Sequence, residues 1–215
     1  MRGSRHPRAA PSGAASLWGL AHAVALVIFA GAAAAQAPDL ERARRIVAGT
    51  CFLCHGVDGE SSSELFPKLG AQHAAYLEKQ LANFKSGARR SETMAPMVRD
   101  LSTADFSSLG AYFAGKPATA NEVKDAELVA VGRYVYAQGN RWSGVAACQG
   151  CHGPAGHGTE ALPRLAGQNA LYLENQLKQF NTRARTNDND VMHAIAAKLT
   201  ELETKAVAEF LSAQR

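Results

Sequence analysis

The sequence has little of what marks nucleic-acid-binding or disulfide-bonded proteins. Aromatic residues make up 7% of the 215 residues, and no basic patch with interleaved aromatics argues for binding to nucleic acid. The four cysteines all lie in two C-x-x-C-H motifs, so none is left over for a structural disulfide. No strong period-two alternation predicts a β-strand. These absences favour an all-α protein whose cysteines carry chemistry.

Three units of the net charge of +4 come from the N-terminal segment. The formal net charge is +4, with 23 basic and 19 acidic residues. Residues 1–35 contain three arginines and no acid, so the rest of the chain has 20 basic and 19 acidic residues and a net charge of +1. The charge of the chain beyond residue 35 therefore gives no indication of a strongly charged partner.

The same N-terminal residues read as a secretory signal. A basic start is followed by an apolar run and then by small residues, as in signal peptides. We expect residues 1–35 to be removed, with cleavage near Ala35 or Ala37. A retained membrane anchor is the alternative, but the run is short for a membrane span and is interrupted by Gly19 and His22.

An internal repeat organises the rest of the chain. Residues 67–84 (PKLGAQHAAYLEKQLANF) align with residues 163–180 (PRLAGQNALYLENQLKQF), and 10 of these 18 positions are identical. The two cysteine motifs are 97 residues apart. Such periodicity predicts a tandem duplication. We expect one domain at residues 36–116, a linker at 117–126 rich in turn-forming and charged residues, and a second domain at 127–215.

Each half has about three segments with helical periodicity. The first has apolar residues on one face, namely Leu40, Ala43, Ile46 and Val47 in one half and Leu128, Val131, Val135 and Tyr136 in the other. The middle helix covers the aligned Tyr76–Phe84 and Tyr172–Phe180. The third begins at the capping boxes of residues 102–105 and 200–203. Three small helices bury little apolar surface, which favours a bound cofactor in each half.

The C-x-x-C-H spacing is typical of covalent c-type haem attachment. The two motifs consist of Cys51, Cys54 and His55, and of Cys148, Cys151 and His152. In each, two thiols one helical turn apart can bind the porphyrin vinyl groups, and the histidine can bind the iron. A zinc site normally brings two such pairs within about 20 residues of each other, and a thioredoxin-like dithiol expects a βαβ context. Neither condition holds, so the sequence predicts two haem c groups.

Methionines at matched distances are the candidates for the second iron ligand. Met94 follows His55 by 39 residues, and Met192 follows His152 by 40. A lone methionine is usually core filler, but the matched interval favours His/Met ligation in both halves. Met97 remains an alternative to Met94. His73, His157 and His193 have no histidine at the aligned position, so we do not expect them to be ligands.

The two motifs and the duplicated P-x-L-x-x-Q-x-x-Y-L-x-x-Q-L-x-x-F segment resemble the dihaem cytochrome c4 family. The resemblance covers essentially the whole chain after the signal segment. It implies two tandem class I cytochrome c domains of the bacterial periplasm, each built around one covalently attached haem. It also implies that the carbonyl groups of Pro67 and Pro163 accept hydrogen bonds from His55 and His152. Such contacts orient a ligand ring.

The function implied by this resemblance is electron transfer, often toward terminal oxidases. The expected partners are a redox protein donor and acceptor, such as a membrane oxidase or a dehydrogenase, and we expect no small-molecule substrate and no catalytic residues. Four haem propionates would make the loaded protein mildly acidic. One alternative is a cytochrome subunit of a larger dehydrogenase complex. A haem enzyme, such as a peroxidase or a sulfur-oxidising cytochrome, is another, but it would need an open iron position.

Overall fold

The computed structural model describes residues 37–215, and the regular elements over that range are all helices joined by loops. The predicted signal segment and the first candidate cleavage site, at Ala35, lie outside the described residues, and the second, at Ala37, lies at their start. Residues 36–215 form one compact unit. The only β-type pairing in the described residues is an isolated bridge between Asn140 and Val145. The prediction of an all-α fold is confirmed.

The helices follow the sequence repeat. The first half contains α1 (Leu40–Ile46), the π-helix η1 (Val47–Cys51), α2 (Phe52–His55), α3 (Ala74–Ser86), α4 (Met94–Val98) and α5 (Thr103–Ala114). The second half contains α6 (Ala126–Gln138), α7 (Gln149–His152), α8 (Ala170–Asn181), α9 (Val191–Ala196) and α10 (Glu201–Ser212). To the three helices predicted from periodicity, the first half therefore adds three short ones (η1, α2 and α4) and the second half adds two (α7 and α9).

Side-chain caps fix where the longer helices begin. Both predicted capping boxes are present, one at the start of α5 and one at the start of α10. In each, the hydroxyl of Ser102 or Thr200 accepts the third helical amide, and an acidic side chain accepts the amide of the cap residue. These bonds satisfy backbone donors that a helix end leaves free.

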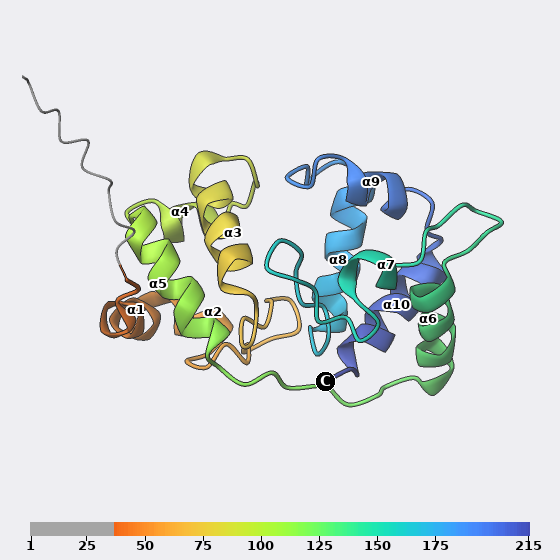
Figure 1. Cartoon of the computed structure of the whole chain (residues 1–215), viewed down its shortest axis with the longest axis horizontal. Helices are drawn as coiled ribbons and strands as arrows, with labels where there is room; N and C mark the ends of the chain where they lie inside the picture. Colours follow the sequence, from red (N-terminus) through yellow and green to blue (C-terminus); the bar gives the residue numbers. More distant parts are fainter. Residues whose placement is uncertain (1–36) are drawn as a thin grey trace, which may run out of the picture. The chain divides into compact units, whose positions relative to one another are not determined.

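The last helix of each half packs across the other two (Figure 1). In the first half α5 contacts α3 and α1, and in the second α10 contacts α6 and α8. A separate apolar cluster fills each half. The α6–α10 crossing is close because Gly132 lies against the backbone of Ala206, where a Cβ atom would clash.

The prediction of which residues form the buried face of α6 was wrong at one position. We predicted Val131 on the buried face, but Val131 is exposed, and the buried positions are Val129, Gly132, Val135 and Tyr136. The buried face of α6 is rotated relative to the predicted one, because it is centred on Gly132, the residue that allows α10 to approach. Leu40 is also exposed, since it is the first residue of α1, whereas Ala43 and Val47 are buried as predicted.

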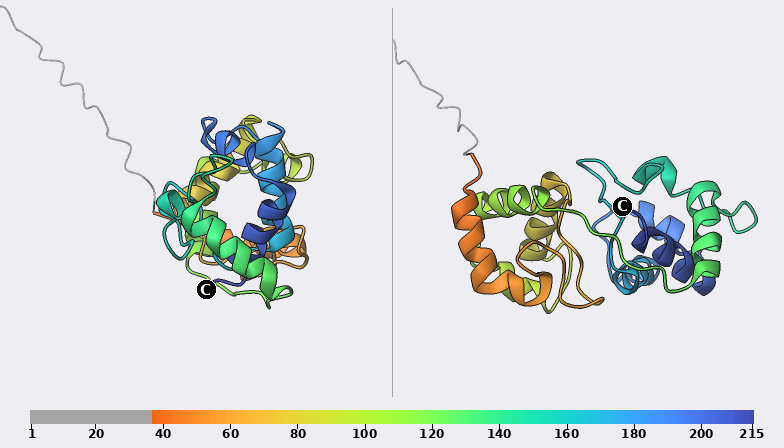
Figure 2. Two further views of the ribbon diagram at one scale, coloured as in Figure 1. Left: turned by 90° about the vertical axis from the view of Figure 1, so that its right-hand side faces the viewer. Right: turned by 90° about the horizontal axis from the view of Figure 1, so that it is seen from below.

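The segment between the halves, residues 115–125, contains no helix. It runs past the C-terminal end of the chain (Figure 2), where the Asn121 amide N–H donates to the Ser212 carbonyl at 3.0 Å. The Lys68 ammonium group donates to Thr119 and Asn121. These contacts hold the segment against both halves. Within residues 37–215, no helix combines the length and the apolar character that crossing a bilayer requires.

Candidate haem sites

The first C-x-x-C-H motif lies at the junction of two helices. Cys51 ends η1, and Cys54 and His55 belong to α2, so the chain keeps helical geometry through the motif. His55 is 7% exposed, and its Nδ1 atom lies 2.9 Å from the Pro67 carbonyl oxygen. The carbonyl oxygen can only accept, so Nδ1 must carry the proton. The other ring nitrogen, Nε2, then has a lone pair available for a metal.

The second motif repeats this arrangement. Cys148 precedes α7, and Cys151 and His152 lie within it. His152 is buried, and its Nδ1 atom lies 3.3 Å from the Pro163 carbonyl oxygen. The histidine–proline contact inferred from the family resemblance is thus present in both halves, although it is longer in the second.

Burial lowers the pKa of both His55 and His152, and the hydrogen bond to the proline carbonyl partly opposes that shift. The two rings are therefore neutral at physiological pH. A neutral imidazole held by a carbonyl at Nδ1 is the form and orientation that a metal-ligating histidine requires.

All four cysteines are free thiols. Burial raises the pKa of Cys51 and raises that of Cys148 to about 11, so both are protonated at neutral pH. No group of three or more His, Cys, Asp or Glu side chains in the described residues is arranged to hold a metal ion. Two unpaired thiols one helical turn apart, followed by a neutral buried imidazole, fit covalently attached haem.

The candidate methionines lie on equivalent short helices. Met94 is the first residue of α4 and Met192 the second residue of α9, and both are half-buried. Met97 is 47% exposed. The Met94 amide donates to the Ser91 hydroxyl at 3.1 Å and the Met192 amide donates to the Asp188 carboxylate at 2.6 Å. Their role as iron ligands remains a prediction.

The three remaining histidines of the described residues bond to backbone carbonyls. The partner carbonyls are His157 for His73, Arg215 for His157 and Phe180 for His193. These contacts occupy one nitrogen of each ring, and the expectation that the three rings do not ligate iron remains a prediction.

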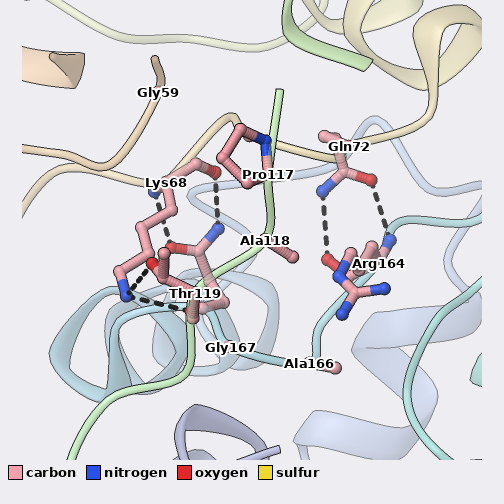
Figure 3. A pocket seen from close by; sticks show the side chains of 11 residues that line it. Gly59, Lys68, Gln72, Pro117, Ala118, Thr119, Arg164, Ala166 and Gly167 are labelled. Atoms are coloured by element: carbon pink, nitrogen blue, oxygen red, sulfur yellow. Dashed lines mark hydrogen bonds between the residues drawn. The ribbon is translucent and has the colours of Figure 1, made fainter. Parts of the chain in front are cut away.

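Sequence reasoning missed the contacts between the two halves. The Gln72 side chain pairs with the backbone of Arg164, donating to its carbonyl at 3.0 Å and accepting from its amide at 2.8 Å (Figure 3). The aligned Gln168 pairs in the same way with the backbone of Lys68, at 2.9 and 2.8 Å. Both glutamines are among the identical positions of the repeat, which was the available signal.

Arg89 and Arg185 form a second set of crossed contacts that the sequence analysis overlooked. Arg89, from the first half, donates to Tyr172 and Gln176 of the second half. Arg185 donates to Tyr76 and Gln80 of the first. The two arginines are 96 residues apart, the offset of the aligned repeat segments, so extending that alignment would have found them.

A fold of two small helical units, each with one haem-attachment motif, defines a class of c-type cytochromes. The family model for cytochrome c matches the chain twice, over residues 40–139 and 136–214. The cytochrome c4 of Thiocapsa roseopersicina is 40% identical over 184 residues, covering 84% of this chain and 95% of that protein. A crystal structure of reduced recombinant cytochrome c4 from Pseudomonas stutzeri superposes with a TM-score of 0.79 at 34% identity, covering 83% of this chain and 100% of that one.

Another relative carries a different name. A protein of Thiomonas intermedia called thiosulfate dehydrogenase electron acceptor is 35% identical over 175 residues, which cover 78% of this chain and 79% of that protein.

The chain belongs to the dihaem cytochrome c4 family. It is therefore an electron-transfer cytochrome with two covalent haem c groups, one for each cysteine motif, and its partners are redox proteins.

Proposed function

We propose that the protein is an exported, periplasmic electron carrier in which each haem iron has one histidine and one methionine ligand. Cys51 and Cys54 hold the first haem and Cys148 and Cys151 the second. The iron ligands are His55 with Met94, and His152 with Met192. The observation that carries this proposal is the duplicated contact of a buried, neutral histidine with a proline carbonyl directly after the cysteine motif.

In this proposal the polypeptide holds the haem groups and orients the iron ligands, and it makes or breaks no bond during electron transfer. The Pro67 and Pro163 carbonyls fix the proton on Nδ1 and direct Nε2 toward the iron. Haem supplies reversible one-electron exchange between ferrous and ferric iron, and methionine ligation raises the reduction potential. We place the domain boundaries at residues 36–116 and 127–215, joined by 117–126, so that each domain carries a complete ligand set.

The ligand assignment is tested with single methionine variants. The ferric protein should show the methionine-to-iron absorption near the red end of the visible spectrum. Since two sites contribute, Met94→Ala and Met192→Ala should each remove about half of it, whereas Met97→Ala should leave it unchanged. Full absorption in Met192→Ala would show that the assignment is wrong.

Counting haems and probing for an open site separates a carrier from a haem enzyme. A pyridine haemochrome assay of the denatured protein should give two haems per chain. Carbon monoxide should bind slowly or not at all to the ferrous protein, because both axial positions are filled. Rapid binding would instead support an enzyme with an open iron position.

The mass of the protein recovered from the periplasm tests cleavage after Ala35 or Ala37.

We further propose that a dehydrogenase supplies the electrons and that a terminal oxidase accepts them. The name of the Thiomonas intermedia relative supports a dehydrogenase as donor. Permanent docking as a subunit of such an enzyme is the second candidate. Stopped-flow mixing of the ferric protein with a purified thiosulfate dehydrogenase and thiosulfate, which supplies the electrons, tests the donor, and gel filtration of the mixture tests the complex. Reduction without co-elution supports a diffusing carrier, whereas co-elution supports a subunit.

A further inference from the structure

A buried tyrosine hydroxyl contacts the turn that follows each cysteine motif. The Tyr112 hydroxyl lies 2.9 Å from the Val57 carbonyl oxygen. The Tyr136 hydroxyl lies 2.5 Å from the Gly153 carbonyl oxygen. A carbonyl oxygen can only accept, so each hydroxyl is the donor. Burial raises the pKa of Tyr136 to about 12, so this hydroxyl keeps its proton at neutral pH. The post-motif turns are the residues directly after each C-x-x-C-H motif: 56–59 and 153–156.

The two hydroxyl groups come from different helices. Tyr112 belongs to α5, the last main helix of its half, whereas Tyr136 belongs to α6, the first helix of its half. The position in α10 that corresponds to Tyr112 is Phe210, because the two are 98 residues apart, the same offset as the two capping boxes. In the first half, the apolar cluster around Tyr112 contains Val47, which cannot donate a hydrogen bond. The two halves therefore share the hydrogen bond to the turn, and they do not share the position of the tyrosine.

In the first half, the post-motif turn also holds the segment that contacts His55. The Gly59 carbonyl oxygen, at the end of the turn, accepts the amides of Leu69 and Gly70 at 2.7 and 3.2 Å. These amides lie two and three residues after Pro67, whose carbonyl oxygen bonds to Nδ1 of His55 at 2.9 Å. A continuous series of hydrogen bonds thus joins the tyrosine hydroxyl, the turn, the proline segment and the histidine ring.

The second half repeats this series of hydrogen bonds. The Gly156 carbonyl oxygen accepts the amides of Leu165 and Ala166 at 2.7 and 3.0 Å. These amides follow Pro163 by two and three residues, and the Pro163 carbonyl oxygen lies 3.3 Å from Nδ1 of His152. Among the described residues, the tyrosine hydroxyl is the one side-chain donor to a backbone carbonyl of each post-motif turn. Its removal therefore leaves the turn with backbone hydrogen bonds alone.

We propose that Tyr112 and Tyr136 are positioning residues, each of which orients the iron-binding histidine of its own half, and that either of two helices can supply the hydroxyl. The hydroxyl fixes the turn, the turn fixes the proline segment, and the proline carbonyl fixes the ring. A hydrogen bond at Nδ1 makes the imidazole a more basic ligand, and a more basic ligand favours ferric iron. Loss of the hydroxyl should weaken that bond and raise the reduction potential. The inference rests on the haem groups and histidine ligands of the proposed function.

Spectroelectrochemical titration of the haem-loaded protein is the principal test. Tyr136→Phe removes the hydroxyl but keeps the ring, which packs 5.4 Å from the Phe210 ring between centres. It should raise one of the two midpoint potentials, and Tyr112→Phe should raise the other one. The control is Tyr134→Phe, which should move neither, because Tyr134 is 65% exposed. Unchanged midpoints in both buried variants, or a shift of the same midpoint by both, would overturn the proposal.

A second variant tests whether the hydroxyl can be moved between helices. Adding Phe210→Tyr to Tyr136→Phe gives the second half the arrangement of the first, with the hydroxyl on the last helix. The double variant should return the shifted midpoint toward the wild-type value. A folded double variant with two haems and a fully shifted midpoint would show that the helices are not interchangeable. The positioning role itself is decided by the single variants, whether or not the double variant folds.

Thermal unfolding of the same variants separates positioning from structural support. A hydroxyl that only stabilises the fold would lower the unfolding temperature without moving a midpoint, and that result would overturn the proposal. The hyperfine-shifted proton signals of the ferric protein give an independent measure, because Tyr136→Phe should shift those of one haem only. Haem count and methionine-to-iron absorption of the wild-type protein report separately on the proposed carrier function. Their failure would contradict that function, whereas unchanged midpoints in the variants would contradict the positioning role alone.

Discussion

The Asp105 carboxylate joins a helix cap to an ion pair. It accepts the Ser102 amide at 2.8 Å and the Ser102 hydroxyl at 2.7 Å, and Arg42 of α1 donates to both of its oxygens. The Arg42 guanidinium, together with the Ser102 bonds, holds the pKa of this buried carboxyl well below its usual range. One side chain thereby fixes the start of α5 and its contact with α1.

Asp105→Asn should therefore destabilise the first half by about 1–2 kcal/mol at neutral pH, from the loss of a charged cap. A depressed native pKa contributes stability above the unfolded value of about 3.9, and this contribution disappears as pH falls toward the native pKa. The difference between wild type and variant should thus shrink in acid. Urea unfolding followed by circular dichroism at neutral and acidic pH measures it.

The control is Asp100→Asn, because Asp100 is exposed and only 3.7 Å from an equally exposed Arg99. An exposed pair of this kind contributes about 0–1 kcal/mol. If the loss in Asp105→Asn were independent of pH, its charge would not be the source of the stability.

The packing of helix α6 against α10 requires glycine at position 132. A Cβ atom at Gly132 would overlap the Ala206 backbone and crowd Phe210. Helix propensity alone favours alanine over glycine by about 1 kcal/mol. At Gly132 the packing outweighs this gain in helix propensity, since overfilling a close contact costs about 1–3 kcal/mol.

We expect Gly132→Ala to destabilise the second half, with thermal unfolding followed by circular dichroism as the measurement. Ala130→Gly is the matched control, because Ala130 is an exposed position in the same helix. It should cost about 1 kcal/mol from propensity. The two substitutions are chemically opposite and should nevertheless both destabilise. A gain in stability in Gly132→Ala would show that the two helices separate at little cost.

The crossed glutamine pairs should make the two halves unfold together. Gln72 and Gln168 each contribute two hydrogen bonds to the backbone of the opposite half. Changing both to alanine leaves the backbone groups of Lys68 and Arg164 without these partners, which costs about 1–3 kcal/mol for each buried group. Differential scanning calorimetry should then resolve two transitions or one broadened transition.

Gln149→Ala is the control for this prediction, because the Gln149 amide bonds to Ala137 within the second half. That variant should lower the stability of one half while leaving the sharpness of the transition unchanged. A sharp single transition in the double variant would place the coupling between the halves elsewhere, for example in the crossed contacts of Arg89 and Arg185.

Much of this architecture could be predicted from local sequence. The capping boxes of Ser102 and Thr200 depend on residues three positions apart, and the main helices on a period of 3.6. Helices α4 and α9 were not predicted, because five or six residues are too few to show a helical period. The crossed contacts between the halves were not predicted for a different reason. Gln72 and Arg164 are 92 residues apart, and nothing local to either residue indicates its partner.

The reciprocal form of the crossed contacts also bears on how such a chain could arise. Gln72 and Gln168, like Arg89 and Arg185, use the same surface from opposite sides, as the two copies in an isologous dimer do. A single ancestral unit that paired with itself would already have possessed both sides of each contact. Fusion of two copies would have preserved that pairing without new substitutions. The sequences of the halves could then diverge while the interface between them was kept.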